Sequence, residues 1–419
     1  MTSETLAFGA KATFAIAADD VIVPMAATNG ITVATATGGI TGVPKCMQRN
    51  WELRAGADGH SLVLFYVGAV DGTVDEGAYG KKIVMEVAGY AGSTLTNFPV
   101  LVRLSTGIAR FSYSDFRLPR GGDLRFTDAD GRLIPHEIDT WDEDGTSCVW
   151  VKVPTLAGGT RIVALYDCAQ PDTPSAESVW DGDYVGVWHL GESALPLKES
   201  SGTSSDFTSQ SGTGIGYAAD GIVGGSVDFG APRGGRVVNA PDHDALDGFT
   251  QCTFEAWTFV TNRPTDGDKS AGLLSKRSGY GSHASYHIYD NGSTTAIYVS
   301  SNSSAHAFGA SVISPAVNAW THQAYTFDAG FIRGYKDGVS SGANTCSAKK
   351  INAGAADLHL GNFQVGDSRN YPGKVDELRI SKVVRSADWI KASHDTVSDA
   401  AFLTFALTDL RVGLHILFR

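Results

Sequence analysis

The chain has 419 residues, of which 42% are hydrophobic, so it can form the cores of two or three domains. Its formal net charge of −12 argues against proteins that bind nucleic acid or anionic membranes through a basic face. No apolar run is long enough for a membrane-spanning helix. The first residues lack the charged-then-apolar order of a signal peptide, which leaves a cytosolic protein, a mature form or a fragment as alternatives.

Residues 1–78 are rich in Ala, Thr and Gly and end in an acidic, Gly-rich linker. Within them, the apolar run of residues 61–67 (SLVLFYV) predicts a buried strand. We interpret this segment as the β-rich remnant of a larger unit, followed by a linker.

Residues 79–175 contain a dense series of predicted strands separated by turn signals such as DADG. Strands at such short intervals predict an all-β sandwich. The strand candidates are residues 82–87, 98–104, 123–127 and 133–138.

Cys148 and Cys168 flank two apolar runs on either side of residues 156–160 (LAGGT). This arrangement predicts a β-hairpin centred on Gly158, which would place the two sulfurs opposite each other. A cross-strand disulfide and a pair of buried free thiols are the two alternatives. Because the chain has 5 cysteines, one thiol is left over in either case.

Residues 176–398 repeat this pattern at a larger scale, and many strands with few helical patterns predict a double-sheet jelly roll. Ser386 predicts the N-cap of a helix over residues 387–393. Residues 399–419 are an apolar tail of unknown role, for which a strand, an amphipathic helix and part of a neighbouring unit remain open. The strand candidates are residues 184–190, 226–229, 252–260, 272–276, 285–289, 296–299, 320–327, 331–335, 358–360 and 373–380.

Motifs of this last large segment follow one another in an ordered set: WHLGE (188–192), SVDFG (226–230), FTQCTFEAW (249–257), WTHQAYTF (320–327), YKDG (335–338) and GKVDELRISKVVRSADWI (373–390). In this order they resemble a LamG-like, concanavalin A-like lectin/glucanase domain. The preceding residues 98–156 resemble the DUF2341 family, which has no known function and often precedes LamG-like domains in bacterial surface or secreted proteins. The resemblance implies an all-β chain, with a β-sandwich followed by a concanavalin A-like jelly-roll sandwich. It also implies an extracellular or cell-surface location and the recognition of a carbohydrate or glycoconjugate.

Asp376 lies in a predicted strand (KVDELRI), where alternation places it on one face with Leu378 and Ile380. Glu377 and Arg379 fall on the other face, as an exposed pair that contributes little to stability. A carboxylate on an apolar face needs a partner, so structural pairing, a bound cation and catalysis are the alternatives for Asp376.

Glu255 shares one face of a predicted central strand with Trp257. A carboxylate near an indole ring suits a sugar site, in which the ring stacks on the sugar and the carboxylate accepts hydrogen bonds from hydroxyl groups. The alternative is that Trp257 belongs to the core. Glycanases of the resembled fold generally carry two close carboxylates on one strand in E-x-D-x-x-E spacing, which is absent here. The sequence therefore favours a non-catalytic module, with a hydrolase that uses Glu255 or Asp376 as the alternative.

His287 and Tyr289 share a face in SYHIYD, and tyrosines of nearby strands could line a groove, although such residues usually serve the core or cross-strand pairs. The histidines show no metal-binding spacing such as HExxH. Calcium is possible because the chain has Asp-rich turns, but each turn is also ordinary turn chemistry. These turns lie at residues 128–130, 181–183, 242–244 and 266–268.

These observations predict a carbohydrate- or glycoconjugate-recognition module of a bacterial surface or secreted protein, whose partner is a glycan or cell-surface polymer rather than nucleic acid. The hypothesis requires no cofactor, allows Ca²⁺, and leaves the metal and the oligomeric state open. The candidate ligand-binding residues are Glu255, Trp257, His287, Tyr289 and Asp376, and no catalytic residue is assigned. A polysaccharide-active glycoside hydrolase and a structural or adhesive spacer module remain the alternatives.

Overall fold

The computed structural model describes residues 73–410 except residues 173, 266–268, 278–284, 303–304 and 308–310. Before residue 73 it describes the backbone of six strands, in two antiparallel three-stranded sheets. The strand predicted from residues 61–67 falls in the last of these. One sheet has the order β1 (Ser3–Ala7), β4 (Gly30–Thr37) and β3 (Asp20–Ala27), and the other β2 (Lys11–Ile16), β5 (Arg49–Ala55) and β6 (Leu62–Ala69).

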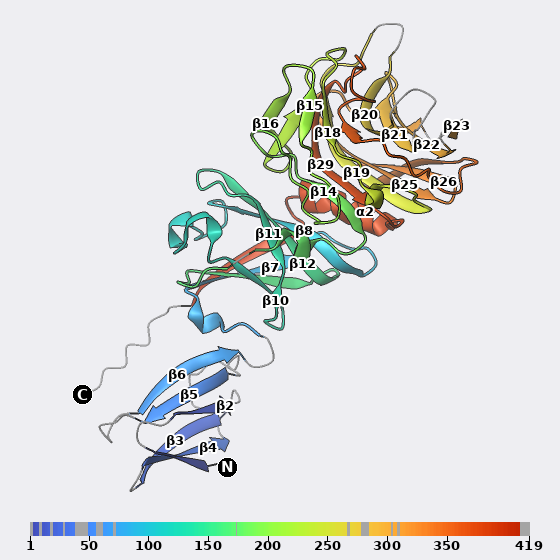
Figure 1. The fold of residues 1–419 in the computed structure, drawn as a ribbon. Helices are drawn as coiled ribbons and strands as arrows, with labels where there is room; N and C mark the ends of the chain where they lie inside the picture. The colour runs from blue at the N-terminus through green and yellow to red at the C-terminus, as the bar shows by residue number, and fades with distance from the viewer. Residues whose placement is uncertain are drawn as a thin grey trace.

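A first β-sandwich follows, built from one five-stranded and one three-stranded antiparallel sheet (Figure 1). Its core is made of large apolar side chains from both sheets, among them Phe98, Phe126 and Val151, which are fully buried. The five-stranded sheet has the order β10 (Leu133–Ile134), β9 (Arg125–Asp128), β13 (Arg161–Tyr166), β7 (Lys81–Val87) and β30 (Leu403–Asp409). The three-stranded sheet has the order β11 (His136–Thr140), β12 (Thr146–Leu156) and β8 (Leu95–Ser105).

The hairpin predicted around Gly158 is wrong. β12 pairs with β8 and β11, whereas β13 pairs with β7 and β9, so the two consecutive strands lie in different sheets. Both strands are buried on both faces, which requires protein packed against each face of the strand. Each strand is central in its own sheet, with a paired strand on either edge. Consequently Cys148 and Cys168 do not face each other, and both are buried free thiols.

The segment predicted as an apolar tail begins with β30, which pairs with β7 over its full length at the edge of the first sandwich. Of the three alternatives for residues 399–419, the strand is therefore realised for Leu403–Asp409. The chain thus leaves the first sandwich after β13, forms the jelly roll, and returns to the first sandwich at its end.

The second sandwich is the predicted jelly roll, with two antiparallel sheets of eight strands each. Sheet I contains β14 (Tyr184–Trp188), β16 (Gly216–Asp220), β17 (Gly225–Asp228), β19 (Gln251–Val260), β25 (Trp320–Asp328), β26 (Phe331–Lys336), β27 (Val339–Thr345) and β29 (Gly373–Ser381). Sheet II contains β15 (Ser209–Ser211), β18 (Val237–Ala240), β20 (Ala271–Lys276), β21 (Tyr286–Asp290), β22 (Thr295–Asn302), β23 (Ala305–Ala307), β24 (Ser311–Ile313) and β28 (Leu358–Leu360). Their inner faces meet in one apolar core, so the predicted fold class is confirmed.

Two α-helices, α1 (Ala176–Val179) and α2 (Ala387–Ser398), lie where the two sandwiches meet, and α2 is visible there in Figure 1. As predicted, Ser386 caps α2, and its hydroxyl accepts a hydrogen bond from the backbone N–H of Trp389. Four short 3₁₀ turns complete the described elements, at Glu76–Ala78, Tyr113–Asp115, Pro119–Gly121 and Asp244–Leu246. In the part of the chain that the structure describes, no helix is long and apolar enough to cross a membrane.

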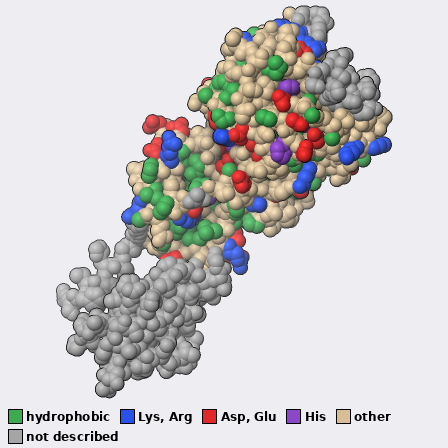
Figure 2. All heavy atoms as spheres, in the orientation of Figure 1, with side chains coloured by type: hydrophobic (Ala, Val, Ile, Leu, Met, Phe, Trp, Pro, Cys, Tyr) green, Lys and Arg blue, Asp and Glu red, His purple; other side chains and the backbone are tan. Residues whose placement is uncertain are grey.

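The acidic balance of the sequence is visible on the surface. On the face drawn in Figure 2, acidic side chains form several groups, and hydrophobic side chains appear in small separate clusters between polar ones. Scattered apolar side chains of this kind are normal for a folded surface.

Candidate functional site

The two outer faces of the jelly roll differ in what covers them. Trp257 on the outer face of sheet I belongs to the same hydrophobic cluster as Trp389 of α2 and Phe98 of the first sandwich. That face is therefore closed by protein. Among the described residues, the outer face of sheet II shares no hydrophobic cluster with the first sandwich, so it is the candidate face for a site.

Six side chains form a continuous row across the outer face of sheet II. The row is fixed by the register, because each member lies directly opposite the next on the neighbouring strand. Their sequence neighbours, such as Leu274, Ile288 and Ile297, lie in the core, so alternation points the row away from it. In order, the row consists of Ser209, Asn239, His359, Ser275, His287 and Tyr298.

The row ends in an aromatic cluster. The rings of His287 and Tyr298 are stacked with centroids 5.1 Å apart, and Tyr289 lies 5.5 Å from Tyr298. Phe363, from the segment after β28, lies within 5.7 Å of both His287 and Tyr289. Tyr289 and Tyr298 are only half-buried, so through them the cluster meets solvent.

The other end of the row is a hydrogen-bonded polar strip. His359 Nδ1 lies 2.7 Å from Asn239 Oδ1, and Asn239 Nδ2 donates to Ser209 Oγ at 3.4 Å. Burial lowers the pKa of His359 below its ordinary value, which favours a neutral ring that can donate from one nitrogen and accept at the other. Among the described residues, the buried hydroxyl of Ser275 has no hydrogen-bond partner. Asn239, His359, Ser275 and His287 are each at most 7% exposed, so the row meets solvent at its two ends, Ser209 and Tyr298.

Phe363 is held between two guanidinium groups. Arg277 and Arg369 place their central carbons 4.3 and 4.7 Å from its ring centroid, within the range of a cation–π contact. Asp367 accepts two hydrogen bonds from Arg369, at 2.6 and 2.9 Å. Although partial burial acts to raise the pKa of Asp367, the bonds from Arg369 hold it below its ordinary value, so this carboxylate is ionised.

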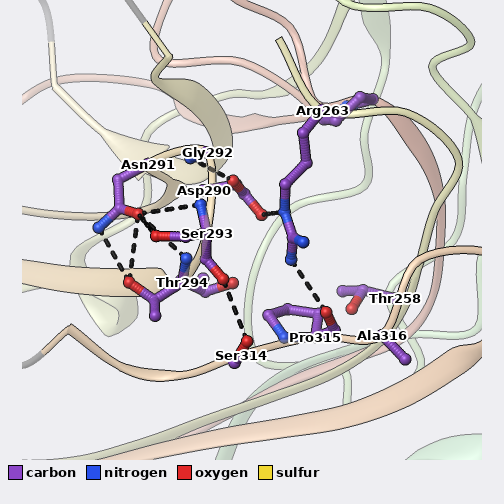
Figure 3. A network of polar contacts seen from close by, with 12 residues as sticks. Thr258, Arg263, Asp290, Asn291, Gly292, Ser293, Thr294, Ser314, Pro315 and Ala316 are labelled. Carbon is purple, nitrogen blue, oxygen red and sulfur yellow. Dashed lines mark hydrogen bonds and ion pairs between the residues drawn. The ribbon is translucent and has the colours of Figure 1, made fainter. Parts of the chain in front are cut away.

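A separate polar network fixes the end of the β21–β22 hairpin, which carries the aromatic cluster (Figure 3). The fully buried carboxylate of Asp290 accepts from Arg263 Nε at 3.0 Å and from the Gly292 N–H at 2.6 Å. Arg263 also donates to the carbonyl of Pro315 at 2.9 Å. The Asn291 side chain accepts from the Thr294 N–H and closes the turn. These bonds anchor the hairpin, and with it Tyr289, to two neighbouring loops.

The predicted site residues are divided between the two faces. His287 and Tyr289 lie together in the aromatic cluster of sheet II, with ring centroids 5.6 Å apart. Glu255, Trp257 and Asp376 lie on the covered outer face of sheet I.

Glu255 is only 3% exposed, and its Oε1 lies 3.6 Å from His322 Nε2. Burial raises the pKa of this carboxyl, while the positive charges of Arg379 and Arg385 oppose the rise. The Trp257 ring packs between His322 and His394 of α2, at centroid distances of 5.2 and 5.4 Å.

The face predicted for Asp376 is wrong, because β29 contains a bulge at Glu377. In the pairing with β19, Asp376 lies opposite Trp257 and Arg379 lies opposite Glu255. The two residues between them on β29 therefore face Ala256 alone, which is the pattern of a β-bulge. The first of the two, Glu377, has a positive φ of 51°. The bulge turns Asp376 to the outer face, away from the core residue Leu378. There Asp376 Oδ2 accepts backbone N–H bonds from Ile222 and Val223, at 2.7 and 3.0 Å, which is the structural pairing considered above.

The exposed pair predicted from Glu377 and Arg379 is also wrong. Both residues are buried, and Arg379 Nη2 donates to Glu377 Oε2 at 2.7 Å. The sequence did not indicate that a second domain covers this face of the strand.

Three of the four Asp-rich turns lie within the described residues and act in local bonding or ion pairs. In the first turn, Asp128 accepts hydrogen bonds from the backbone N–H groups of Asp130 and Arg132. In the second turn, Asp181 forms an ion pair with Arg385. In the third turn, Asp242 forms an ion pair with Lys276. The fourth turn, residues 266–268, falls outside the described residues. No group of three or more His, Cys, Asp or Glu side chains in the described residues is placed to hold a metal ion.

Sequence reasoning missed Asn239, Ser275, His359 and Phe363. Each lies on a short strand or loop with no distinctive motif, and the four come from three separate segments of the chain. Only the strand register, which places His359 between Asn239 and Ser275, reveals the row.

Comparisons with known families confirm both resemblances in the predicted order. Residues 120–189 match DUF2341, a domain of unknown function, and residues 232–391 match the concanavalin A-like lectin/glucanases superfamily. The first match begins later and ends later than the predicted residues 98–156. None of the curated proteins compared with the chain matches it.

Several solved structures are similar to part of the chain. The binding domain of botulinum neurotoxin serotype G is 12% identical, with a TM-score of 0.39 over 50% of each chain. The binding domain of Paraclostridial Mosquitocidal Protein 1 is 11% identical, with a TM-score of 0.41 over 51% of this chain and 52% of that one. The chain thus spans about half the length of these two domains. Domain 4 of AbnA, an extracellular arabinanase from Geobacillus stearothermophilus solved with arabinotriose, is 20% identical, with a TM-score of 0.39 over 52% of this chain and 98% of that domain.

Proposed function

We propose that this chain is a non-catalytic carbohydrate-recognition module of a bacterial surface or secreted protein, and that the glycan lies across the outer face of sheet II. The observation that carries the proposal is the aromatic end of the row, where the half-buried rings of Tyr289 and Tyr298 lie 5.5 Å apart and meet solvent. A glycan offers hydroxyl groups to neutral donors and acceptors and apolar C–H faces to aromatic rings. The match to the lectin/glucanase superfamily supports the same class of ligand.

Of the five candidate residues, we assign Tyr289 to ligand contact, because its half-buried ring meets solvent, and His287 to the support of that ring, because it is only 7% exposed. We assign Glu255, Trp257 and Asp376 to the contact between the two sandwiches. A ligand that reached these three side chains would have to displace α2 or the first sandwich, which cover this face of sheet I.

The test begins with a glycan array probed with the full chain, followed by titration calorimetry with the strongest ligand. Tyr289→Ala and Tyr298→Ala each remove a half-buried ring of the cluster and are expected to weaken binding at least about tenfold, equivalent to about 1.4 kcal/mol. Phe331→Ala is the matched control, because Phe331 is an exposed aromatic residue on β26 of sheet I. Absence of any glycan ligand at millimolar concentration, or equal losses in all three variants, would contradict the proposal.

A further inference from the structure

The two sandwiches share structural elements. α2 follows the jelly roll in the chain, yet its Trp389 packs edge-on against Phe98 of β8, with ring centroids 5.0 Å apart. The Thr396 hydroxyl of the same helix accepts a hydrogen bond from the Leu101 N–H of β8 at 2.9 Å. Because β8 is an edge strand, this N–H would otherwise have no partner in the sheet. On its other side, Ile390 packs against side chains of sheet I. α2 is thus a layer common to both sandwiches, and β30 then completes a sheet of the first.

A buried ion-pair network crosses the same junction. The ring of His189, just after β14 of the jelly roll, lies between two carboxylates: Nδ1 is 2.8 Å from Glu377 of β29, and Nε2 is 3.3 Å from Glu137 of the first sandwich. A carboxylate beside each ring nitrogen favours the doubly protonated imidazolium cation. The first sandwich therefore supplies one of the two carboxylates in contact with the His189 ring.

Glu137 is itself fully engaged at this junction. Its Oε1 accepts from Ser200 Oγ of the jelly roll at 2.7 Å, and its Oε2 accepts from Trp180 Nε1 at 2.8 Å. Buried carboxylates are tolerated only with this degree of pairing and hydrogen bonding. Its position in β11 therefore depends on the jelly roll as much as His189 depends on Glu137.

A second cation of the jelly roll is covered by aromatic rings. The guanidinium of Arg379 on β29 lies 4.3 Å from the ring centroid of Trp150 of the first sandwich and 4.9 Å from that of Trp180. Without the first sandwich, Arg379, Glu377 and His189 would lose their cover and part of their charge partners. Without the jelly roll, Trp150 would lose its contact with Arg379.

From these contacts we propose a function for the first sandwich, which contains part of the residues that match DUF2341: it is an intramolecular structural partner without which the jelly roll does not reach its stable fold. It closes the outer face of sheet I, supplies Glu137 and Trp150 to two buried cations, and is completed in return by α2 and β30. The two sandwiches thereby form one cooperative folding unit, and sheet II is left as the outer face available to a ligand.

The first experiment cuts the chain between the two sandwiches. A protease recognition sequence is inserted in the full chain between Pro174 and Ser175, which are both exposed, and the folded protein is then cleaved. The two pieces are expected to co-elute as one particle at micromolar concentration and to unfold in urea in a single transition. Separation of the pieces, or two separate transitions of the intact chain, would overturn the proposal.

The second experiment does not depend on the insertion being tolerated. Glu137→Gln keeps the shape of the side chain but removes its charge, and hydrogen exchange is followed in β12 of the first sandwich and in β29 of the jelly roll. Protection is expected to fall at least tenfold in both strands. Glu86→Gln, which removes a carboxylate paired with Arg161 on the surface of the same sandwich, is the matched control and should leave β29 unchanged. A Glu137→Gln variant that lowers protection in β12 alone would also overturn the proposal.

Discussion

The two outer faces of the jelly roll use histidine in opposite ways. On sheet I, His189 lies between two carboxylates; burial alone would lower its pKa, but Glu377 and Glu137 raise it well above the ordinary value. On sheet II, His359 is bonded to the neutral amide of Asn239, and burial lowers its pKa. The covered face is thus held together by charges, whereas the other face presents neutral hydrogen-bonding groups. A charged network suits a permanent protein contact, and a neutral one suits exchange between water and a ligand.

The largest expected difference between the two faces is in the stability that is lost when one carboxylate is replaced by an amide. Glu377→Gln leaves His189 and Arg379 short of a buried charge partner and should lower the free energy of unfolding by about 3 kcal/mol. Asp367→Asn removes the partner of Arg369 on the sheet II side, where the arginine is partly exposed, and should cost about 1 kcal/mol or less. Urea denaturation of both variants measures the two losses, and equal losses would remove the distinction between the faces.

The dependence of stability on pH should have opposite signs for the two histidines. In the folded protein the pKa of His189 lies above its value in the unfolded chain, which is about 6.5. Protonated His189 therefore adds to the free energy of unfolding below about pH 6.5, and this contribution is lost as the pH rises through the raised folded pKa. The charged groups that face it are Glu137 and Asp139 of β11 and Glu377 and Arg379 of β29. His189→Gln should therefore flatten the alkaline side of the stability profile.

His359 has a pKa below its unfolded value, so its contribution is present above about pH 6.5 and is lost as the pH falls through the lowered folded pKa. The charged groups around it are Asp357, Arg277 and Lys276. His359→Gln should flatten the acid side. A difference of one pH unit between folded and unfolded pKa corresponds to about 1.4 kcal/mol, which thermal melts from pH 4 to pH 10 resolve. Profiles that change on the same side in both variants would contradict this assignment.

The sequence was sufficient for the elements of this fold but not for the contacts between them. Alternation, turn residues and the Ser386 cap predicted the sandwich, the jelly roll and α2, because each depends on residues close together in the chain. The connection around Gly158 was misjudged because a short turn can join two strands of one sheet or of two facing sheets. Only the burial of β12 and β13 on both faces distinguishes these possibilities.

The candidate site was predictable only in part for the same reason. His287 and Tyr289 lie two residues apart on one strand, so alternation alone joined them. Asp376 was placed on the wrong face because a bulge is a property of the pairing between β29 and β19, which a single strand does not reveal. Asn239 and His359 are 120 residues apart, and their hydrogen bond depends on the register of β18 against β28.

The smallest expected effect concerns the centre of the row on sheet II. Ser275 and Ser226 are both fully buried serines of the jelly roll, but Ser226 Oγ donates to the carbonyl of Ala219 at 3.1 Å, whereas Ser275 Oγ has no protein partner among the described residues. Removal of a satisfied hydroxyl costs about 1 kcal/mol, whereas removal of an unsatisfied one is neutral or stabilising. Ser226→Ala should therefore lower the free energy of unfolding by about 1 kcal/mol, and Ser275→Ala should leave it unchanged or raise it slightly. Urea denaturation of the two variants measures the two effects, and equal losses of stability would contradict this assignment.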